Sequence, residues 1–155
     1  MKIFLHGLDS SSQGTKAVFF RERYPDMLTP DFSGPLEERV QQLEGILSGT
    51  AGLRIVGSSF GGLMATVFAM QHESSIERMV LLAPAINLLA ASGYPEKRVS
   101  VPVWVFHGNH DDVIPLRDAR AVARRIFPHL TFREVEDDHN LHGTFRTFDW
   151  DMLLR

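Results

Sequence analysis

A serine flanked by glycines, at the junction of two apolar segments, constrains the fold of this chain most. The segment Gly57-Ser58-Ser59-Phe60-Gly61 follows Leu53-Arg54-Ile55-Val56, which is short and mostly aliphatic like a buried parallel strand. After it, apolar residues recur at helical spacing: Phe60, Leu63, Met64, Val67 and Phe68. Glycines two residues before and after a serine permit a sharp strand-to-helix turn, the G-x-S-x-G pattern of a nucleophile elbow. We therefore expect Ser59 at the carboxyl edge of a sheet, beside helix N-terminal amides that favour negative charge.

Two later strand ends place acid and base candidates at the same edge. The apolar run 101–106 leads into a loop that contains Asp111 and Asp112, and the alternating run 130–135 leads to His139 and then His142. The order Ser59, Asp111, His139 is the chain order of α/β-hydrolase triads and differs from that of chymotrypsin or subtilisin. His139 comes first after its strand, whereas a capping or surface role is more ordinary for His142. Asp112 and His142 stay open as alternatives.

An oxyanion hole requires a second amide from the loop after an early strand. Residues 2–5 predict that strand, and His6-Gly7-Leu8-Asp9 follow it. The backbone N–H groups of Leu8 and Phe60 are the candidates, because such holes use the residue after the nucleophile and one residue of this loop. We interpret His6 as a structural histidine that braces the loop.

These motifs together resemble those of α/β-hydrolases, and more narrowly those of small lidless bacterial serine esterases of the YqiA type. The resemblance implies serine esterase activity with the triad Ser59, Asp111 and His139, because the acid of that group corresponds to Asp111. Ser12 departs from the group, which often has proline there, and His142 adds a second histidine. The resemblance covers most of the chain and is carried by Leu5-His6-Gly7-Leu8-Asp9-Ser10-Ser11-Ser12-Gln13, Lys16-Ala17, Gly57-Ser58-Ser59-Phe60-Gly61-Gly62, Ala65-Thr66 and Ala83-Pro84-Ala85.

Alternating strand and helix patterns predict a three-layer α/β-hydrolase fold, with a minimal parallel sheet of about six strands and helices on both faces. One domain is expected over residues 1–155. The segment between Ala83 and Val101 is too short for a cap domain. We expect strands at 2–6, 27–30, 53–57, 78–82, 101–106 and 130–135, and helices at 14–23, 35–48, 60–72, 84–91, 116–127 and 143–154.

Composition excludes several function classes. The chain of 155 residues has a net charge of −3, so neither a nucleic acid nor a membrane is an expected partner. It has no cysteine, which excludes thiol nucleophiles and zinc–thiolate sites, and no signal peptide or spanning segment is evident. Cytoplasmic localisation is the resulting expectation. No metal and no cofactor are expected, because His107, His110 and their neighbours lack ligand spacing, and we interpret these two histidines as turn residues.

The sequence thus predicts a carboxylesterase-type serine hydrolase that forms an acyl-enzyme on Ser59 and acts on a small-molecule ester. Short acyl chains are expected, because a chain without a lid has few apolar residues left to line a long acyl tunnel. Thioesterase, lipase and peptidase activities stay open, since a fold does not fix its substrate. A catalytically inactive binding module is an alternative from a different class. The physiological acyl group, the leaving group and the oligomeric state are not determined by the sequence.

Overall fold

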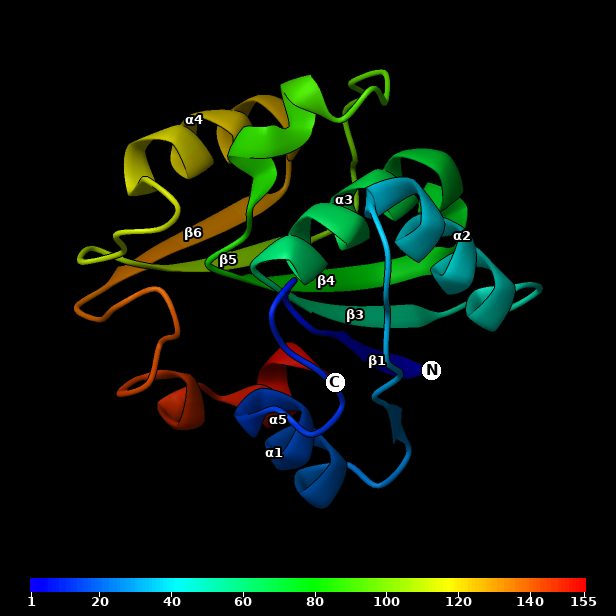
Figure 1. Ribbon diagram of the computed structural model, residues 1–155, viewed down its shortest axis with the longest axis horizontal. Coiled ribbons are helices and arrows are strands. Elements are labelled where there is room, and N and C mark those ends of the chain that lie inside the picture. The colour runs from blue at the N-terminus through cyan, green and yellow to red at the C-terminus, as the bar shows by residue number, and fades with distance from the viewer.

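The computed structural model describes residues 1–155 and contains a six-stranded parallel sheet between two helical layers (Figure 1). The strands are β1 (Lys2–Leu5), β2 (Met27–Leu28), β3 (Leu53–Ser58), β4 (Ile76–Leu82), β5 (Val103–Gly108) and β6 (Leu130–Val135), in the spatial order β2-β1-β3-β4-β5-β6. The helices are α1 (Thr15–Arg23), α2 (Leu36–Leu47), α3 (Phe60–His72), α4 (Leu116–Ile126) and α5 (Trp150–Leu153). Three 3₁₀ turns complete the elements: η1 (Glu73–Ser75), η2 (Ile86–Ala91) and η3 (Phe145–Thr147). The predicted α/β-hydrolase fold is confirmed.

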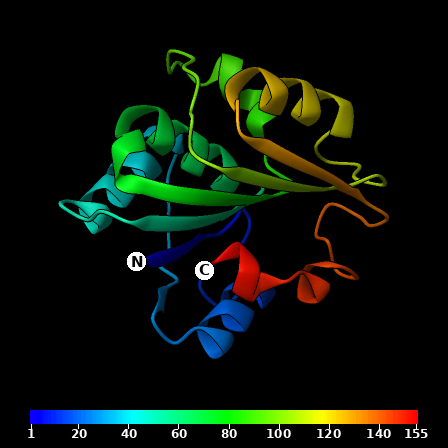
Figure 2. The ribbon, with the colours of Figure 1, turned by 180° about the vertical axis from the view of Figure 1, so that it is seen from behind.

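Helices α2, α3 and α4 cover one face of the sheet, and α1 and α5 cover the other (Figures 1 and 2). Strand residues alternate between the two layers, as a pleated strand requires: Ile55 and Met79 belong to one core cluster, Val56 and Val80 to the other. The first cluster has 30 buried residues and the second has 13, so the α2–α4 layer supplies most of the core. None of the helices combines the length and the apolar character needed to cross a membrane.

The connection between β4 and β5 carries only the 3₁₀ turn η2, and no cap domain is inserted there. All neighbouring strands pair in parallel, so their carboxyl ends lie at one edge of the sheet. The loops that leave β1, β3, β5 and β6 at this edge carry every residue proposed for catalysis.

Three predicted elements differ from the structure. The expected helix 143–154 is divided into η3 and α5, because Phe145, Phe148 and Trp150 all pack in the smaller core cluster and their spacing does not fit one helix face. The Asp149 side chain then caps α5 by accepting the N–H of Met152 at 3.0 Å.

The expected strand 27–30 is only two residues long, and Pro30, which lacks an N–H, lies just beyond it. The segment 84–91 forms a 3₁₀ turn in place of a short helix.

Candidate active site

Ser59 occupies a strained turn between β3 and α3. Its φ and ψ of 53° and −115° lie outside the usual regions for a residue with a side chain. The turn is held from both sides: the Ser59 N–H donates to the carbonyl of Leu82 at 2.9 Å, and its own carbonyl accepts the N–H of Ala85 at 2.9 Å. A Cβ on Gly57 would lie 2.6 Å from the carbonyl oxygen of Gly61. A Cβ on Gly61 would collide with the carbonyl of Leu5. Close packing of backbone against backbone therefore requires both glycines of the motif.

The loops after β3, β5 and β6 bring Ser59, Asp111 and His139 into one hydrogen-bonded chain. The distance from His139 Nδ1 to Asp111 Oδ2 is 2.7 Å, and that from His139 Nε2 to Ser59 Oγ is 2.9 Å. A carboxylate only accepts, so Nδ1 carries the proton and Nε2 is free to accept the hydrogen of the serine hydroxyl. The three residues are 80 and 28 positions apart in sequence, so only the tertiary fold makes these contacts.

The Asp111 carboxylate is fully buried and accepts from two directions. Its Oδ2 faces His139, and its Oδ1 accepts the backbone N–H groups of Val113 and Ile114 at 2.9 and 2.8 Å. Asp112 is exposed and makes no hydrogen bond through its side chain. The geometry therefore places Asp111, and not its neighbour, beside the histidine.

His107 is a second imidazole at the same carboxylate, and the sequence did not reveal it. It is fully buried in β5 and is not the turn residue that we expected. Its Nε2 donates to the carbonyl of Ile114 at 2.9 Å and lies 3.2 Å from Asp111 Oδ2. Burial lowers the pKa of His107, although the Ile114 carbonyl and the Asp111 charge oppose this shift. A neutral imidazole thus packs behind Asp111 and helps to fix its position.

The loop that carries His139 is held by Asp137. Oδ2 of Asp137 accepts the N–H of Gly143 at 3.1 Å and both the N–H and the hydroxyl of Thr144 at 2.8 and 2.6 Å. The Asp137 carbonyl accepts the N–H of His110, which ties this loop to the one that carries Asp111. The alternative base, His142, also lines the cavity, but it is exposed, pairs with Asp138 at 2.9 Å and makes no hydrogen bond to Ser59 or Asp111. The histidine that bridges Asp111 and Ser59 is therefore His139 and not His142.

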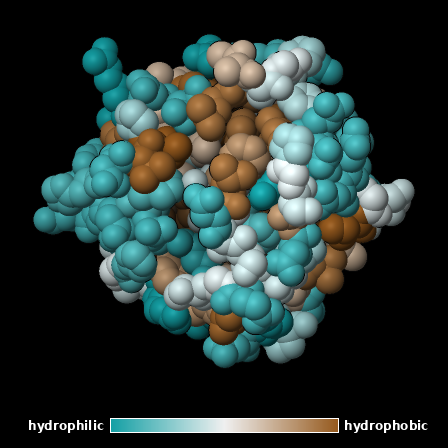
Figure 3. All heavy atoms as spheres, in the orientation of Figure 1, coloured by the Kyte–Doolittle hydropathy of each residue, from teal (hydrophilic) through white to brown (hydrophobic).

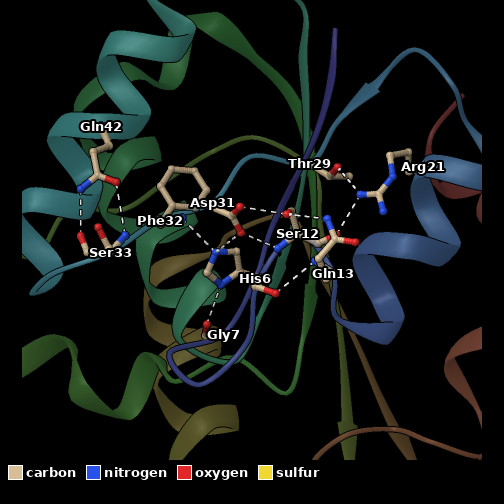
Figure 4. Close-up of polar contacts among 11 residues, drawn as sticks. His6, Gly7, Ser12, Gln13, Arg21, Thr29, Asp31, Phe32, Ser33 and Gln42 are labelled. Atoms are coloured by element: carbon tan, nitrogen blue, oxygen red, sulfur yellow. Dashed lines mark hydrogen bonds and ion pairs between the residues drawn. The ribbon is translucent and has the colours of Figure 1, made fainter.

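The amides of Leu8 and Phe60 have no hydrogen-bond acceptor within the protein. His6, 1% exposed, holds the first of them in place (Figure 4). Its Nε2 accepts the N–H of Phe32 at 3.0 Å, so its Nδ1 carries the proton and donates to the carbonyl of Gly7 at 2.7 Å. The C=O and N–H of a trans peptide point in opposite directions, so the Leu8 N–H points away from His6. The predicted bracing role of His6 agrees with these contacts.

Ser59 and His139 open into a cavity of about 610 Å³. Its lining includes three exposed apolar residues, Leu8, Leu88 and Val113, which are 52%, 43% and 59% accessible. Figure 3 shows hydrophobic atoms gathered on this face over η2 and the start of α3. The start of α1 and the loop after β6 contribute polar residues to the lining, together with Phe145. No group of three or more His, Asp or Glu side chains is arranged to hold a metal ion.

Comparison with protein families gives one match. Residues 1–92, which include β1, the loop with Leu8 and the elbow at Ser59, match the model of the family described as uncharacterised protein family UPF0227. A search of curated proteins found no match.

Solved structures with the α/β-hydrolase fold resemble the chain closely in shape. Est1E from Butyrivibrio proteoclasticus superposes with a TM-score of 0.81 at 16% identity, over 99% of this chain and 85% of Est1E. Alpha/beta hydrolase domain-containing protein 10 from mouse gives 0.78 at 19% identity, over 92% and 83% of the two chains. A YdeN-like hydrolase from Pectobacterium atrosepticum gives 0.77 at 20% identity, over 98% and 86%. At these identities the similarity shows the shared fold.

Proposed function

Because the chain belongs to the UPF0227 family and has the α/β-hydrolase fold, we propose that it is a serine hydrolase that cleaves carboxylic esters. The observation that carries this proposal is the continuous chain from Asp111 through His139 to Ser59 at the strained elbow. The two amides without acceptors, at Leu8 and Phe60, add the donors that a tetrahedral oxyanion needs.

In this mechanism Ser59 Oγ attacks the ester carbonyl while His139 Nε2 takes the hydroxyl proton. The negative charge of Asp111 stabilises the imidazolium that forms. Collapse of the tetrahedral intermediate expels the alcohol, which receives its proton from His139 Nε2. A water molecule, deprotonated by the same nitrogen, then attacks the acyl carbonyl. Collapse of this second tetrahedral intermediate releases the acid and returns the proton from His139 Nε2 to Ser59 Oγ. The Leu8 and Phe60 amides stabilise both intermediates, a contribution of roughly 3–4 kcal/mol for each donor in comparable sites.

The cavity favours a short acyl group. Its exposed apolar lining residues, Leu8, Leu88 and Val113, lie at the protein surface, and the buried apolar residues are gathered in the two core clusters. We therefore expect 4-nitrophenyl acetate and butyrate to react faster than the palmitate, with no rate increase at a lipid–water interface. Faster hydrolysis of long-chain emulsions would contradict this part of the proposal.

Covalent labelling tests the nucleophile directly. A fluorophosphonate probe should label the wild-type protein, and Ser59→Ala should abolish the label and lower kcat for 4-nitrophenyl acetate by roughly 10³-fold or more. Ser58→Ala is the matched control, because it removes a hydroxyl one residue away and should retain labelling. Absence of labelling in a folded wild-type protein would favour the inactive binding module. A parallel assay with an acetyl thioester separates esterase from thioesterase activity.

A further inference from the structure

Lys16 is the only lysine or arginine in the wall of the cavity. Its Nζ donates to the backbone carbonyl of Asn140 at 2.6 Å and lies 5.4 Å from the ring centroid of Phe145. No carboxylate oxygen lies within 4.0 Å of this ammonium, so Lys16 forms no salt bridge within the protein. An ammonium has three donors, and here the protein supplies one acceptor.

The acidic residues near Lys16 are occupied by other donors. Asp137 accepts the backbone and hydroxyl hydrogens of Thr144, and Asp138 pairs with His142. Burial lowers the pKa of Lys16, and the charges of Asp138 and Asp137 oppose this only in part. The protein thus stabilises the ammonium incompletely, and an anion in the cavity would supply what is missing.

The backbone around Lys16 also favours negative charge. Lys16 lies in the first turn of α1, which has no acidic residue, and the N-cap residue Gly14 provides no side-chain cap. The partial positive charge of this helix end adds to that of the ammonium. The only carboxylate in the cavity wall is that of Asp9, on the loop that faces Arg39 of α2.

The position of Lys16 relative to His139 indicates which part of an ester it would contact. The leaving alcohol takes its proton from His139 Nε2, so the alcohol part of the substrate lies on the histidine side of the cavity. Asn140 follows His139 directly in the chain, and its carbonyl is the group that holds the Lys16 ammonium. Lys16 therefore lies on the side of the leaving group.

We propose that Lys16 binds an anionic group on the alcohol part of the substrate, so that the enzyme acts on esters whose leaving group carries a carboxylate or a phosphate. This inference rests on the proposed esterase function. In this arrangement the charged leaving group faces Lys16, and the exposed apolar residues Leu8, Leu88 and Val113 remain for the acyl group.

Two acetate esters of the same shape test the proposal. The leaving group of 3-acetoxybenzoate is anionic and that of 3-acetoxybenzamide is neutral, while both leave the same acetyl-enzyme. We expect the wild type to have the higher kcat/KM for the benzoate. Lys16→Met should lower the benzoate-to-benzamide ratio of kcat/KM by about 10-fold or more, as expected for loss of a charge-assisted hydrogen bond. Lys16→Arg should restore most of the ratio, and high salt should reduce it in the wild type.

Lys97→Met is the matched control, because Lys97 is exposed and outside the cavity and its loss changes the net charge equally. The ratio cancels any general loss of activity that follows if the Asn140 loop moves. An unchanged ratio in Lys16→Met, in a protein that hydrolyses both esters through Ser59, would overturn the anion site and leave the esterase proposal intact. A similar fall of the ratio in Lys97→Met would overturn it too, by assigning the effect to overall charge. A folded wild type that hydrolyses neither ester and is not labelled at Ser59 would overturn both proposals.

Discussion

Replacing Asp111 by asparagine should remove activity through the tautomer of His139 while leaving the fold in place. The wild-type carboxylate lies within reach of four N–H groups: Val113 and Ile114 at Oδ1, and His139 and His107 at Oδ2. An asparagine has one oxygen and one NH₂ group, so it can satisfy only one of these two sides.

The structure indicates which orientation the asparagine adopts. With its NH₂ toward Val113 and Ile114, two buried amides would lose their acceptor, at a cost of about 1–3 kcal/mol each. With its oxygen there, the NH₂ group faces His139, which becomes an acceptor at Nδ1 by moving its proton to Nε2. His107 retains the carbonyl of Ile114 as acceptor. The second orientation is therefore favoured, and it leaves His139 Nε2 protonated and unable to accept the hydrogen of Ser59.

We expect kcat/KM for 4-nitrophenyl acetate to fall by about 10⁴-fold, as for an asparagine in the same position of a triad. The unfolding midpoint in urea should change little, which separates the tautomer effect from a loss of structure. Asp112→Asn is the control, because that side chain is exposed and makes no hydrogen bond, and its activity should stay within about tenfold of the wild type. Retained activity in Asp111→Asn, or a large loss in Asp112→Asn alone, would refute the assignment of the acid.

Three further perturbations test other parts of the site. Gly61→Ala should lower the free energy of unfolding by roughly 1–3 kcal/mol, measured in urea, because its Cβ meets the carbonyl of Leu5, whereas Gly45→Ala in open space should be neutral or stabilising. His6→Leu should lower kcat for 4-nitrophenyl acetate by about 10- to 100-fold with a smaller change in KM, because the Leu8 amide loses the residue that holds it in place. A rise of about 10- to 100-fold in KM with an unchanged kcat would contradict this prediction. The pKa of His107 is lowered by burial, so its contribution to stability is complete above pH 6.5 and is lost as the pH falls below that value. His107→Asn should therefore show a smaller loss of stability than the wild type between pH 7 and 5, and an identical loss would refute the argument.

The sheet, the elbow and the edge at which the chemistry is proposed could all be predicted from the amino-acid sequence. Gly57 and Gly61 flank Ser59 at the spacing that a sharp strand-to-helix turn requires, and apolar periodicity marks the elements on both sides. Such signals are local, because they depend on backbone sterics and on which face of an element is buried. Local patterns gave a wrong prediction at the C-terminus, where one helix was expected at 143–154. Aromatic packing against residues distant in the sequence divides it into η3 and α5.

The choice between adjacent candidates of the same type required the three-dimensional structure. Asp111 and Asp112 are equally acidic in sequence, and what separates them is that one faces His139 while the other faces solvent. His107 and Lys16 likewise gain their positions from residues in the loops after β5 and β6, and for Lys16 the partner is 124 positions away. Contacts of this kind depend on where long loops fold back over the sheet edge. No residue pattern within a single segment specifies them, because each partner is fixed by packing against elements elsewhere in the chain.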